Sequence, residues 1–465
     1  MFIGRTEELK ALNKQYLSNK FEFAVIYGRR RIGKTSLLQE FIKDKEALFF
    51  TGLETTEKQN LINLSSVILD SDTQDLSFNT YQAALEKIFE KANYERFIFV
   101  IDEYPYLANS YPAISSLLQL LIDKNKENSK MFLILCGSSM SFMEEQVLGY
   151  KSPLYGRRTA QYKILPFTFK ETCSFFNHFS YEERAIIYGV TSGIPLYISL
   201  FDENKTLKDN LIDIFFRSNG YLYEEPSNLI KQECRDPSTY NSIVQAIASG
   251  KTKLSEIASQ VGIESGQCTS YINKLIALGI VIKDTPIYKA NKKQTIYLLE
   301  DHMFQFWYKF VLPNVSLINM SMGERVYNRN EKQLPEFMGF IFEDICKQYL
   351  WDLNRLDQSP IFFTHLGRWW GNDGRIKSEA EIDILAYNEE NEAIFGECKW
   401  KNEKVDKEVL DKLMFRSELF TFNKKELYLF SKAGFSDYCK EQAKSNSNIH
   451  LVTFEDIVKK NNELA

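Results

Sequence analysis

The sequence is poor in the residues that build disulfide frameworks and zinc sites. Its 465 residues include seven cysteines and four histidines. The cysteines are odd in number and scattered, without a CxxC pair or a Cys/His cluster. A disulfide-stapled fold and a structural zinc module both require spacings that are missing here, so a reducing cytosol is the expected compartment.

Long apolar runs and an excess of positive charge are also missing. No stretch approaches the roughly 18 apolar residues of a membrane helix, and the opening MFIGRTEELK carries charge where a signal peptide has an apolar segment. The formal net charge of -5 excludes a globally basic nucleic-acid binder, although not a local basic face. We expect a globular cytoplasmic protein of about three domains, without membrane contact.

A glycine-rich loop lies between a predicted strand and a predicted helix near the N-terminus. Residues 23–27 are a short apolar run, and apolar residues at helical spacing follow the loop. The loop matches GxxxxGK[ST], in which the glycines let backbone N–H groups wrap phosphates at a helix N-terminus. Lys34 would reach the β- and γ-phosphates of ATP, and Thr35 would bind Mg²⁺. The predicted ATP-binding loop residues are Gly28, Arg29, Arg30, Arg31, Ile32, Gly33, Lys34, Thr35 and Ser36.

Acidic residues end a second apolar strand, in RFIFVIDEYPYL. Asp102 would belong to the Mg²⁺ shell, and Glu103 would polarise the attacking water. A third apolar strand, MFLILCGSS, is followed by Ser138, which would contact the γ-phosphate or the water, or simply belong to a strand-end turn. The alternation of strands and helices through residue 200 predicts an α/β fold, a parallel P-loop sheet with helices on both faces.

Residues 240–283 have the pattern of a winged helix. Two short amphipathic helices precede a tight turn and a third helix, for which Ser265 is the expected cap, and GIVIKD and QTIYLLED would form the wing. The third helix of such a module can enter the major groove of DNA. The alternative is a module that only packs between domains. The outer face of the third helix would carry Thr269, Ser270, Asn273 and Lys274.

An acid and a base lie side by side in an apolar strand near the C-terminus. In IFGECKW, residues 394–400, Glu397 and Lys399 are two positions apart and therefore share a face. The preceding SEAEIDILAY would pair with this strand as a hairpin and carries Asp383, after a loop that holds GRWWG. An upstream helix would carry Glu343 beside an apolar face made of Phe337, Phe340, Ile341, Ile345 and Tyr349.

These groups are suited to metal-dependent phosphodiester hydrolysis. Asp383 and Glu397 would converge on one or two Mg²⁺ ions, and Glu343 would complete the shell. Lys399 would orient or deprotonate the attacking water. The alternative is an exposed strand pair that happens to bear charges. Four more residues have two interpretations each, as nucleic-acid contacts or as ordinary surface and core positions: Lys412, Arg416, Trp369 and Trp370.

Two known families resemble parts of the chain. FIGRTEELKAL, LILCGSSMSFME, SPLYGRRT and TSGIPLY, with the loop and acid motifs, resemble the archaeal-type branch of the AAA+/STAND P-loop ATPases. This resemblance implies that Arg157 or Arg158 reaches the γ-phosphate of a neighbouring subunit in an ATP-dependent homo-oligomer, with surface arginines as the alternative, and that a helical lid begins near Pro195. Residues 335–450 resemble the PD-(D/E)xK nucleases, and more closely the nuclease-like domain that often ends the archaeal-type ATPases. The proline before the motif aspartate is absent, with Ile382 in its place.

The sequence therefore predicts three modules. They are a P-loop ATPase domain with a helical lid (1–235), a winged helix (236–310) and an α/β PD-(D/E)xK nuclease-like domain (311–465). The main hypothesis is an ATP-hydrolysing, DNA-processing enzyme with a Mg²⁺-dependent nuclease site. The rival hypothesis is an ATP-switched DNA-binding or signalling protein whose nuclease fold is inactive. The expected cofactors are ATP and Mg²⁺, and the expected partner is DNA.

Overall fold

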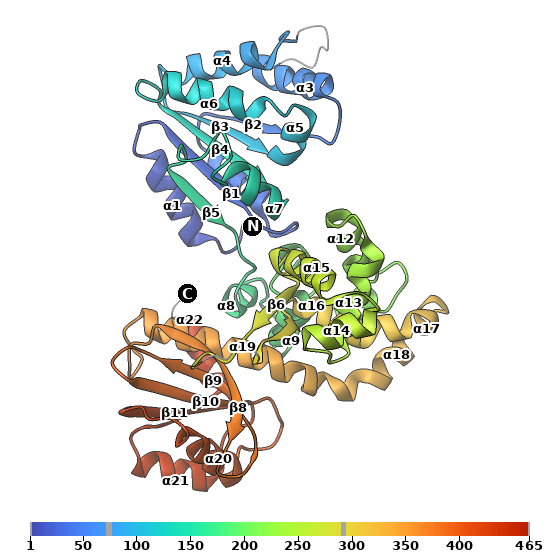
Figure 1. Cartoon of the computed structure of the whole chain (residues 1–465), viewed down its shortest axis with the longest axis vertical. Helices are drawn as coiled ribbons and strands as arrows, with labels where there is room; N and C mark the ends of the chain where they lie inside the picture. The colour runs from blue at the N-terminus through green and yellow to red at the C-terminus, as the bar shows by residue number, and fades with distance from the viewer. Residues whose placement is uncertain (1, 71–76, 290–293, 464–465) are drawn as a thin grey trace. The chain divides into compact units, whose positions relative to one another are not determined.

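The computed structural model describes residues 2–70, 77–289 and 294–463, and the chain divides into two compact units (Figure 1). The first unit comprises residues 1–166 with 194–196, and the second comprises 167–193 with 197–465. The sequence analysis placed the end of the ATPase domain at residue 235. By contacts, the predicted lid residues beyond 196 belong instead to the second unit.

The first unit is an α/β layer structure. Its elements are α1 (Thr6–Tyr16), β1 (Glu22–Tyr27), α2 (Lys34–Ile42), β2 (Ala47–Thr51), α3 (Glu57–Leu69), α4 (Tyr81–Lys91), β3 (Phe97–Asp102), α5 (Tyr104–Ser110), α6 (Ile114–Asn125), β4 (Met131–Gly137), α7 (Met140–Phe142), the π-helix η1 (Met143–Val147) and β5 (Ala160–Lys163). The strands pair in parallel in the order β2-β3-β4-β1-β5.

Alternating side chains along β1 explain why helices cover both faces of this sheet. Phe23, Val25 and Tyr27 belong to one apolar cluster with side chains from α3, α4, α5 and α6. Ala24 and Ile26 belong to another cluster with side chains from α1 and α2. Burying one large apolar side chain contributes about 1.5–3 kcal/mol, so both clusters hold the layers together. The predicted parallel sheet with helices on both faces is confirmed.

The second unit begins with a helical region. Its elements are α8 (Phe169–Cys173), α9 (Tyr181–Thr191), the end of α10 (Pro195–Ile198), whose first two residues belong to the first unit, α11 (Leu207–Phe215), α12 (Glu225–Glu233), α13 (Pro237–Ala248), α14 (Leu254–Val261), α15 (Ser265–Ala277), β6 (Val281–Asp284), β7 (Ile296–Leu299), α16 (His302–Phe306), the π-helix η3 (Trp307–Val311), the 3-10 helix η4 (Leu312–Asn314), α17 (Val315–Asn319), α18 (Gly323–Asn330), the 3-10 helix η5 (Glu331–Gln333) and α19 (Leu334–Arg355).

Helices α13, α14 and α15, followed by the antiparallel β6–β7 hairpin, have the element order predicted for the winged helix. Its identity as a winged helix stays a prediction. The expected cap was wrong, because Ser265 is the first residue of α15 and Glu264 precedes it in an extended conformation. The hydroxyl of a serine satisfies free N–H groups only from the position before the helix.

A mixed sheet ends the chain. It comprises β8 (His365–Asp373), β9 (Ser378–Tyr387), β10 (Glu392–Lys399), β11 (Lys424–Ser431) and β12 (Ile449–Thr453), with α20 (Lys407–Ser417), α21 (Asp437–Ser445) and α22 (Phe454–Glu463). The order is β12-β11-β10-β9-β8, antiparallel from β8 to β10 and parallel from β10 to β12. Leu410 of α20 and Cys439 of α21 pack on one face. On the other face, Tyr349 of α19 packs against Phe430 of β11.

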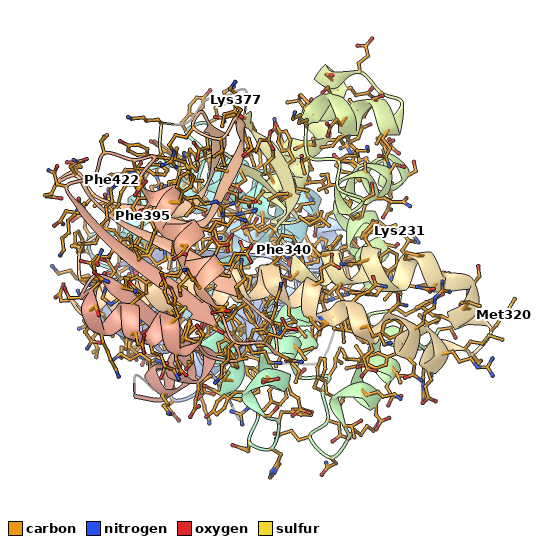
Figure 2. All side chains as sticks on the ribbon, turned by 90° about the horizontal axis from the view of Figure 1, so that it is seen from below. Lys231, Met320, Phe340, Lys377, Phe395 and Phe422 are labelled. Atoms are coloured by element: carbon orange, nitrogen blue, oxygen red, sulfur yellow. The ribbon has the colours of Figure 1, made fainter. Side chains whose placement is uncertain are left out.

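Two sequence expectations for this region were wrong. GRWWG was expected in a loop but lies in β8, where Trp369 pairs with Ile382 and Trp370 with Glu381. The pairing with β9, which makes this stretch a strand, cannot be recognised from the stretch itself. Phe340 was expected on the apolar face of α19 but is 52% exposed, and Figure 2 labels it. Phe342 packs inward instead, with its ring centroid 5.1 Å from that of Trp400.

Candidate functional site

The loop between β1 and α2 requires glycine at both ends of its motif. A Cβ on Gly28 would lie 2.5 Å from the carbonyl oxygen of Ile164, a backbone atom that cannot turn aside. Gly33 has a φ of 85°, a left-handed conformation that L side chains rarely adopt. Helix α2 begins at the next residue, so the loop presents a helix N-terminus with unpaired N–H groups. Such an end favours an anion.

The Lys34 side chain is folded across this loop. It is 6% exposed, and its Nζ donates to the carbonyl oxygens of Gly28 (3.0 Å) and Arg29 (2.9 Å). Burial lowers the pKa of Lys34, while the charges of Glu103 and Asp102 act in the opposite direction. A phosphate oxygen in place of a carbonyl would form a stronger, charge-assisted hydrogen bond. The loop and Lys34 therefore fit the phosphates of a nucleotide.

A hydroxyl and a carboxylate meet beside the loop. Thr35, in the first turn of α2, donates its Oγ1 hydrogen to Oδ2 of Asp102 at 2.7 Å. Asp102 is the last residue of β3 and is 2% exposed. Hard oxygen donors at this spacing suit Mg²⁺, which usually binds one or two side-chain oxygens together with water and phosphate. The donors present therefore fit the predicted role of Thr35 and Asp102.

Glu103 is held by the neighbouring strand. Its φ of 48° is unusual for a residue other than glycine, and it turns the chain from β3 into α5. Its Oε2 accepts a hydrogen bond from Oγ of Ser138 at 2.9 Å. Ser138 follows β4, the strand that pairs with β3. The sequence predicted that Ser138 contacts the γ-phosphate or the water, or belongs to a strand-end turn. In this structure its hydroxyl holds the carboxylate of Glu103, and its contact with phosphate or water stays a prediction.

Two further contacts at the loop were not expected from the sequence. Arg5, 4% exposed, donates from its Nη2 to the carbonyl oxygen of Ile32 at 3.0 Å and so braces the loop from α1. Arg30 donates to the hydroxyl of Tyr106 at 2.9 Å. Arg5 lies in FIGRTEELKAL, one of the stretches that resemble the ATPase family. The resemblance assigned no role to any residue of that stretch.

Arg157 and Arg158, which lie between β4 and β5, differ in their surroundings. Arg157 makes a two-pronged ion pair with Asp123, with Nε–Oδ1 at 3.0 Å and Nη2–Oδ2 at 2.6 Å. Arg158 is half-buried and makes no ion pair with any residue that the structure describes. Arg157 is thus already neutralised within its own chain, and Arg158 has the freer charge.

The predicted acids and lysine of the second unit do come together. The β9–β10 hairpin places Asp383 beside the end of β10, where its Oδ2 accepts the backbone N–H of Cys398 at 2.9 Å. The Nζ of Lys399 lies 2.7 Å from Oε1 of Glu397 and 3.8 Å from Oδ2 of Asp383. We call Asp383, Glu397 and Lys399 the carboxylate–lysine cluster.

One carboxylate oxygen of this cluster is unsatisfied. Glu397 is 7% exposed, and its Oε2 is buried without a hydrogen-bond partner among the described residues. Nη1 of Arg416 lies 3.6 Å from this oxygen, as an ion pair. Burial and then the charge of Asp383 raise the pKa of Glu397. A buried oxygen of this kind is costly unless a cation or a donor satisfies it, so the donor set fits a divalent cation held by two carboxylates.

Glu343 lies near the cluster but is held by basic side chains. Its Oε2 is 3.6 Å from Nε of Arg368 and 3.9 Å from Nζ of Lys347. Burial and then the charge of Asp383 raise the pKa of Glu343 to about 7. Across the described ranges, no three His, Cys, Asp or Glu residues are grouped so that they could hold a metal ion. The role of Glu343 as a third ligand stays a prediction.

The auxiliary residues fall into separate environments. Trp369 packs edge-on against Phe420, with ring centroids 4.8 Å apart, which favours the core interpretation. Lys412 is exposed on α20, whereas Arg416 faces Glu397. Ser270 and Asn273 are exposed on α15, while Thr269 and Lys274 are half-buried.

Comparison with known proteins agrees with the geometry of the first unit. A family model described as an ATPase domain predominantly from Archaea matches residues 2–201. A second, described as archaea bacterial proteins of unknown function, matches residues 307–410. The Walker-type ATPase PABY2304 of Pyrococcus abyssi superposes with a TM-score of 0.51 at 18% identity, over 66% of this chain and 96% of that one, and so shares the fold. Residues 2–201 are thus an archaeal-type P-loop ATPase domain.

The family of this chain is shown by a relative that matches it over nearly its whole length. Uncharacterized protein MJECL04 of Methanocaldococcus jannaschii is 35% identical over 469 residues, which cover 98% of this chain and 100% of the relative. The chain belongs to the family of that protein. The uncharacterized ATP-binding protein MJ0423 of the same organism is 44% identical over 46 residues, 10% of this chain and 78% of that protein. Among the described residues, no helix is long and apolar enough to cross a membrane.

Proposed function

We propose that the protein couples ATP hydrolysis in its first unit to metal-dependent cleavage of DNA at the carboxylate–lysine cluster. The observation that carries the second half is the convergence of Asp383, Glu397 and Lys399 on one end of the β9–β10 hairpin. A buried acid, a half-buried acid and a lysine are costly to bring together unless they serve a ligand or a reaction.

The ATP site has a role for each group described above. Lys34 binds the β- and γ-phosphates, and Thr35 with Asp102 would hold Mg²⁺, which neutralises charge on the phosphates. Glu103 orients and polarises the attacking water. Ser138 positions the Glu103 carboxylate through the bond between the two side chains.

At the second site, Asp383 and Glu397 would hold Mg²⁺, which stabilises the attacking and leaving oxygens of a phosphodiester. Lys399 lies next to both carboxylates and supplies positive charge where the transition state is negative. DNA would be presented by α15, whose exposed Ser270 and Asn273 can donate and accept hydrogen bonds at base edges.

A specific observation favours the alternative of an ATP-switched protein without nuclease activity. Lys399 is already paired with Glu397, and no group of three metal-binding side chains is formed among the described residues. An inactive site of this kind would still let ATP control DNA binding or signalling by the second unit.

The deciding experiment measures ATP turnover and DNA cleavage together, on single-stranded, duplex and branched DNA, with Mg²⁺ and with a chelator. We expect Mg²⁺-dependent cleavage that Asp383→Asn abolishes, while ATP turnover stays unchanged because the two sites lie in different units. No cleavage of any substrate by the wild type would favour the switch. Cleavage that survives Asp383→Asn would place the active site elsewhere.

A further inference from the structure

The segment that follows β6 contacts the C-terminal sheet. The N–H of Ile287 donates to the carbonyl oxygen of Arg368 in β8 at 3.0 Å. The hydroxyl of Tyr387 in β9 donates to the carbonyl oxygen of Ile287 at 3.1 Å. The backbone N–H and the carbonyl oxygen of Ile287 therefore both form hydrogen bonds with the sheet. We call residues 285–289 the docking segment.

Apolar side chains strengthen this contact. Tyr288 packs among Tyr387, Phe420 and Phe422, with ring centroids at 5.4, 5.7 and 4.9 Å. Ile287 lies over Gly367 so closely that a Cβ there would come within 3.1 Å of its Cδ1. Phe422, labelled in Figure 2 with Phe395, belongs to the buried core of the sheet. The docking segment is therefore part of the packing of the C-terminal domain.

The docking segment bonds β8 at a point where its pairing with β9 is irregular. Gly367 pairs with Leu385 and Trp369 with Ile382, so Arg368 alone lies opposite two residues of β9, Asp383 and Ile384. A bulge of this kind changes the direction of side chains on the strand with the extra residue, here Asp383. The side chain of Arg368 contacts Glu343 and Glu381 as ion pairs.

Charges tie Arg368 to the hairpin as well. Burial alone would lower the pKa of Arg368, but the charges of Glu343, Glu381 and Asp284 raise this pKa above its ordinary value. Asp284 is the last residue of β6 and comes directly before the docking segment. Arg368 is thus fixed through its backbone by Ile287 and through its charge by three carboxylates.

We propose that the docking segment is an autoinhibitory contact, which holds Arg368 against Glu343 and so keeps Glu343 from joining Asp383 and Glu397 at a divalent cation. This inference rests on the metal site of the proposed function, though not on cleavage. It explains why three carboxylates lie near one another without forming a metal-binding group among the described residues. Release of the β6–β7 hairpin, for example when DNA binds the helices beside it, would free Glu343.

The test uses the full chain without nucleotide, so that the ATP site does not compete for metal. Mn²⁺ binding is followed by electron paramagnetic resonance, and amide exchange of the docking segment by mass spectrometry. In Tyr288→Ala we expect exchange of residues 285–289 to quicken about tenfold, since a local contact is lost. Mn²⁺ binding should tighten by about tenfold, because Glu343 becomes available as a ligand. Arg368→Gln should tighten binding similarly while the segment stays docked.

Two controls separate the steps. Lys283→Ala changes an exposed residue of the same hairpin and should alter neither measurement. Adding Glu343→Gln to Tyr288→Ala should remove the gain in Mn²⁺ affinity. Tighter binding without any DNA cleavage would support this inference and reject the proposed nuclease function.

Other outcomes overturn the inference. If Tyr288→Ala quickens exchange but leaves Mn²⁺ affinity unchanged, the segment does not control Glu343. If exchange is unchanged in both Tyr288→Ala and Ile287→Asp, these side chains do not hold the hairpin in place, and the contact cannot be inhibitory.

Discussion

Glu103 shows how much of the site depends on single residues. Its position after an apolar strand was predicted from the sequence, because a strand followed by acids is a local pattern. Its bond to Ser138 was not predicted, since it depends on β3 and β4 being neighbours in the sheet. The phosphate loop shows the same contrast. The spacing of Gly28, Gly33 and Lys34 could be recognised locally, whereas the hydrogen bond from Arg5 to Ile32 comes from a distant part of the chain.

The first prediction concerns Glu103. Glu103→Gln keeps the shape of the side chain and removes its basicity, so ATP should bind normally while turnover falls by about 10²–10⁴-fold. Nucleotide binding by fluorescence and phosphate release would be measured on the same sample. Lys34→Ala is the contrasting variant and should lose binding itself. Equal turnover in Glu103→Gln and wild type would rule out the assigned role.

At the scale of elements, a partly buried polar network joins α9 to α19. The hydroxyl of Tyr188 donates to Oδ2 of Asp344 at 2.6 Å and accepts from Nε2 of Gln348 at 2.8 Å. The β9–β10 hairpin was predicted because its apolar runs and turn lie next to each other in the chain. The network and the docking segment were not, because their partners are more than a hundred residues away in one case and about eighty in the other.

The second prediction tests this network. Tyr188→Phe removes the hydroxyl that both Asp344 and Gln348 bond and leaves only the bond between these two partly buried side chains, so the free energy of unfolding should fall by about 1–3 kcal/mol. Chemical denaturation of the full chain would measure it. Tyr94→Phe, which removes a hydroxyl from a side chain that is 80% exposed, is the control and should change little. A loss equal in both variants would contradict a role for the network.

At the scale of the whole molecule, the ATP site and the carboxylate–lysine cluster belong to different compact units. The length of the chain predicted several domains, and the motifs predicted which segments hold the ATP site and the acidic site. The boundary between the two units could not be predicted, because it depends on tertiary contacts and the composition of the sequence does not change there. The sheet of the first unit also leaves Arg158 near its edge strand β5, without an ion pair among the described residues.

The third prediction concerns assembly. We expect ATP to promote association of copies of this chain, with Arg158 contributing charge to a neighbour's γ-phosphate, and Arg158→Ala to weaken both association and turnover. Light scattering with ATP, in the slow Glu103→Gln background, would measure association. Arg157→Ala is the comparison, because that arginine is occupied by Asp123. A particle that stays monomeric with ATP, and full turnover in Arg158→Ala, would reject the prediction.

The short segment 194–196 has a consequence for dissecting the protein. The backbone passes from one compact unit to the other between residues 166 and 167, returns at 194, and leaves again after 196. During this return, Pro195 approaches the phosphate loop so closely that its Cγ would lie 3.8 Å from a Cβ on Gly33. A fragment ending at residue 166 would therefore lack residues that belong beside its own phosphate loop. A single cut between residues 166 and 167 would leave residues 194–196, which belong to the first unit, on the other fragment. Testing the ATP site and the carboxylate–lysine cluster separately calls for point substitutions in the intact polypeptide, since no single cut yields both units whole.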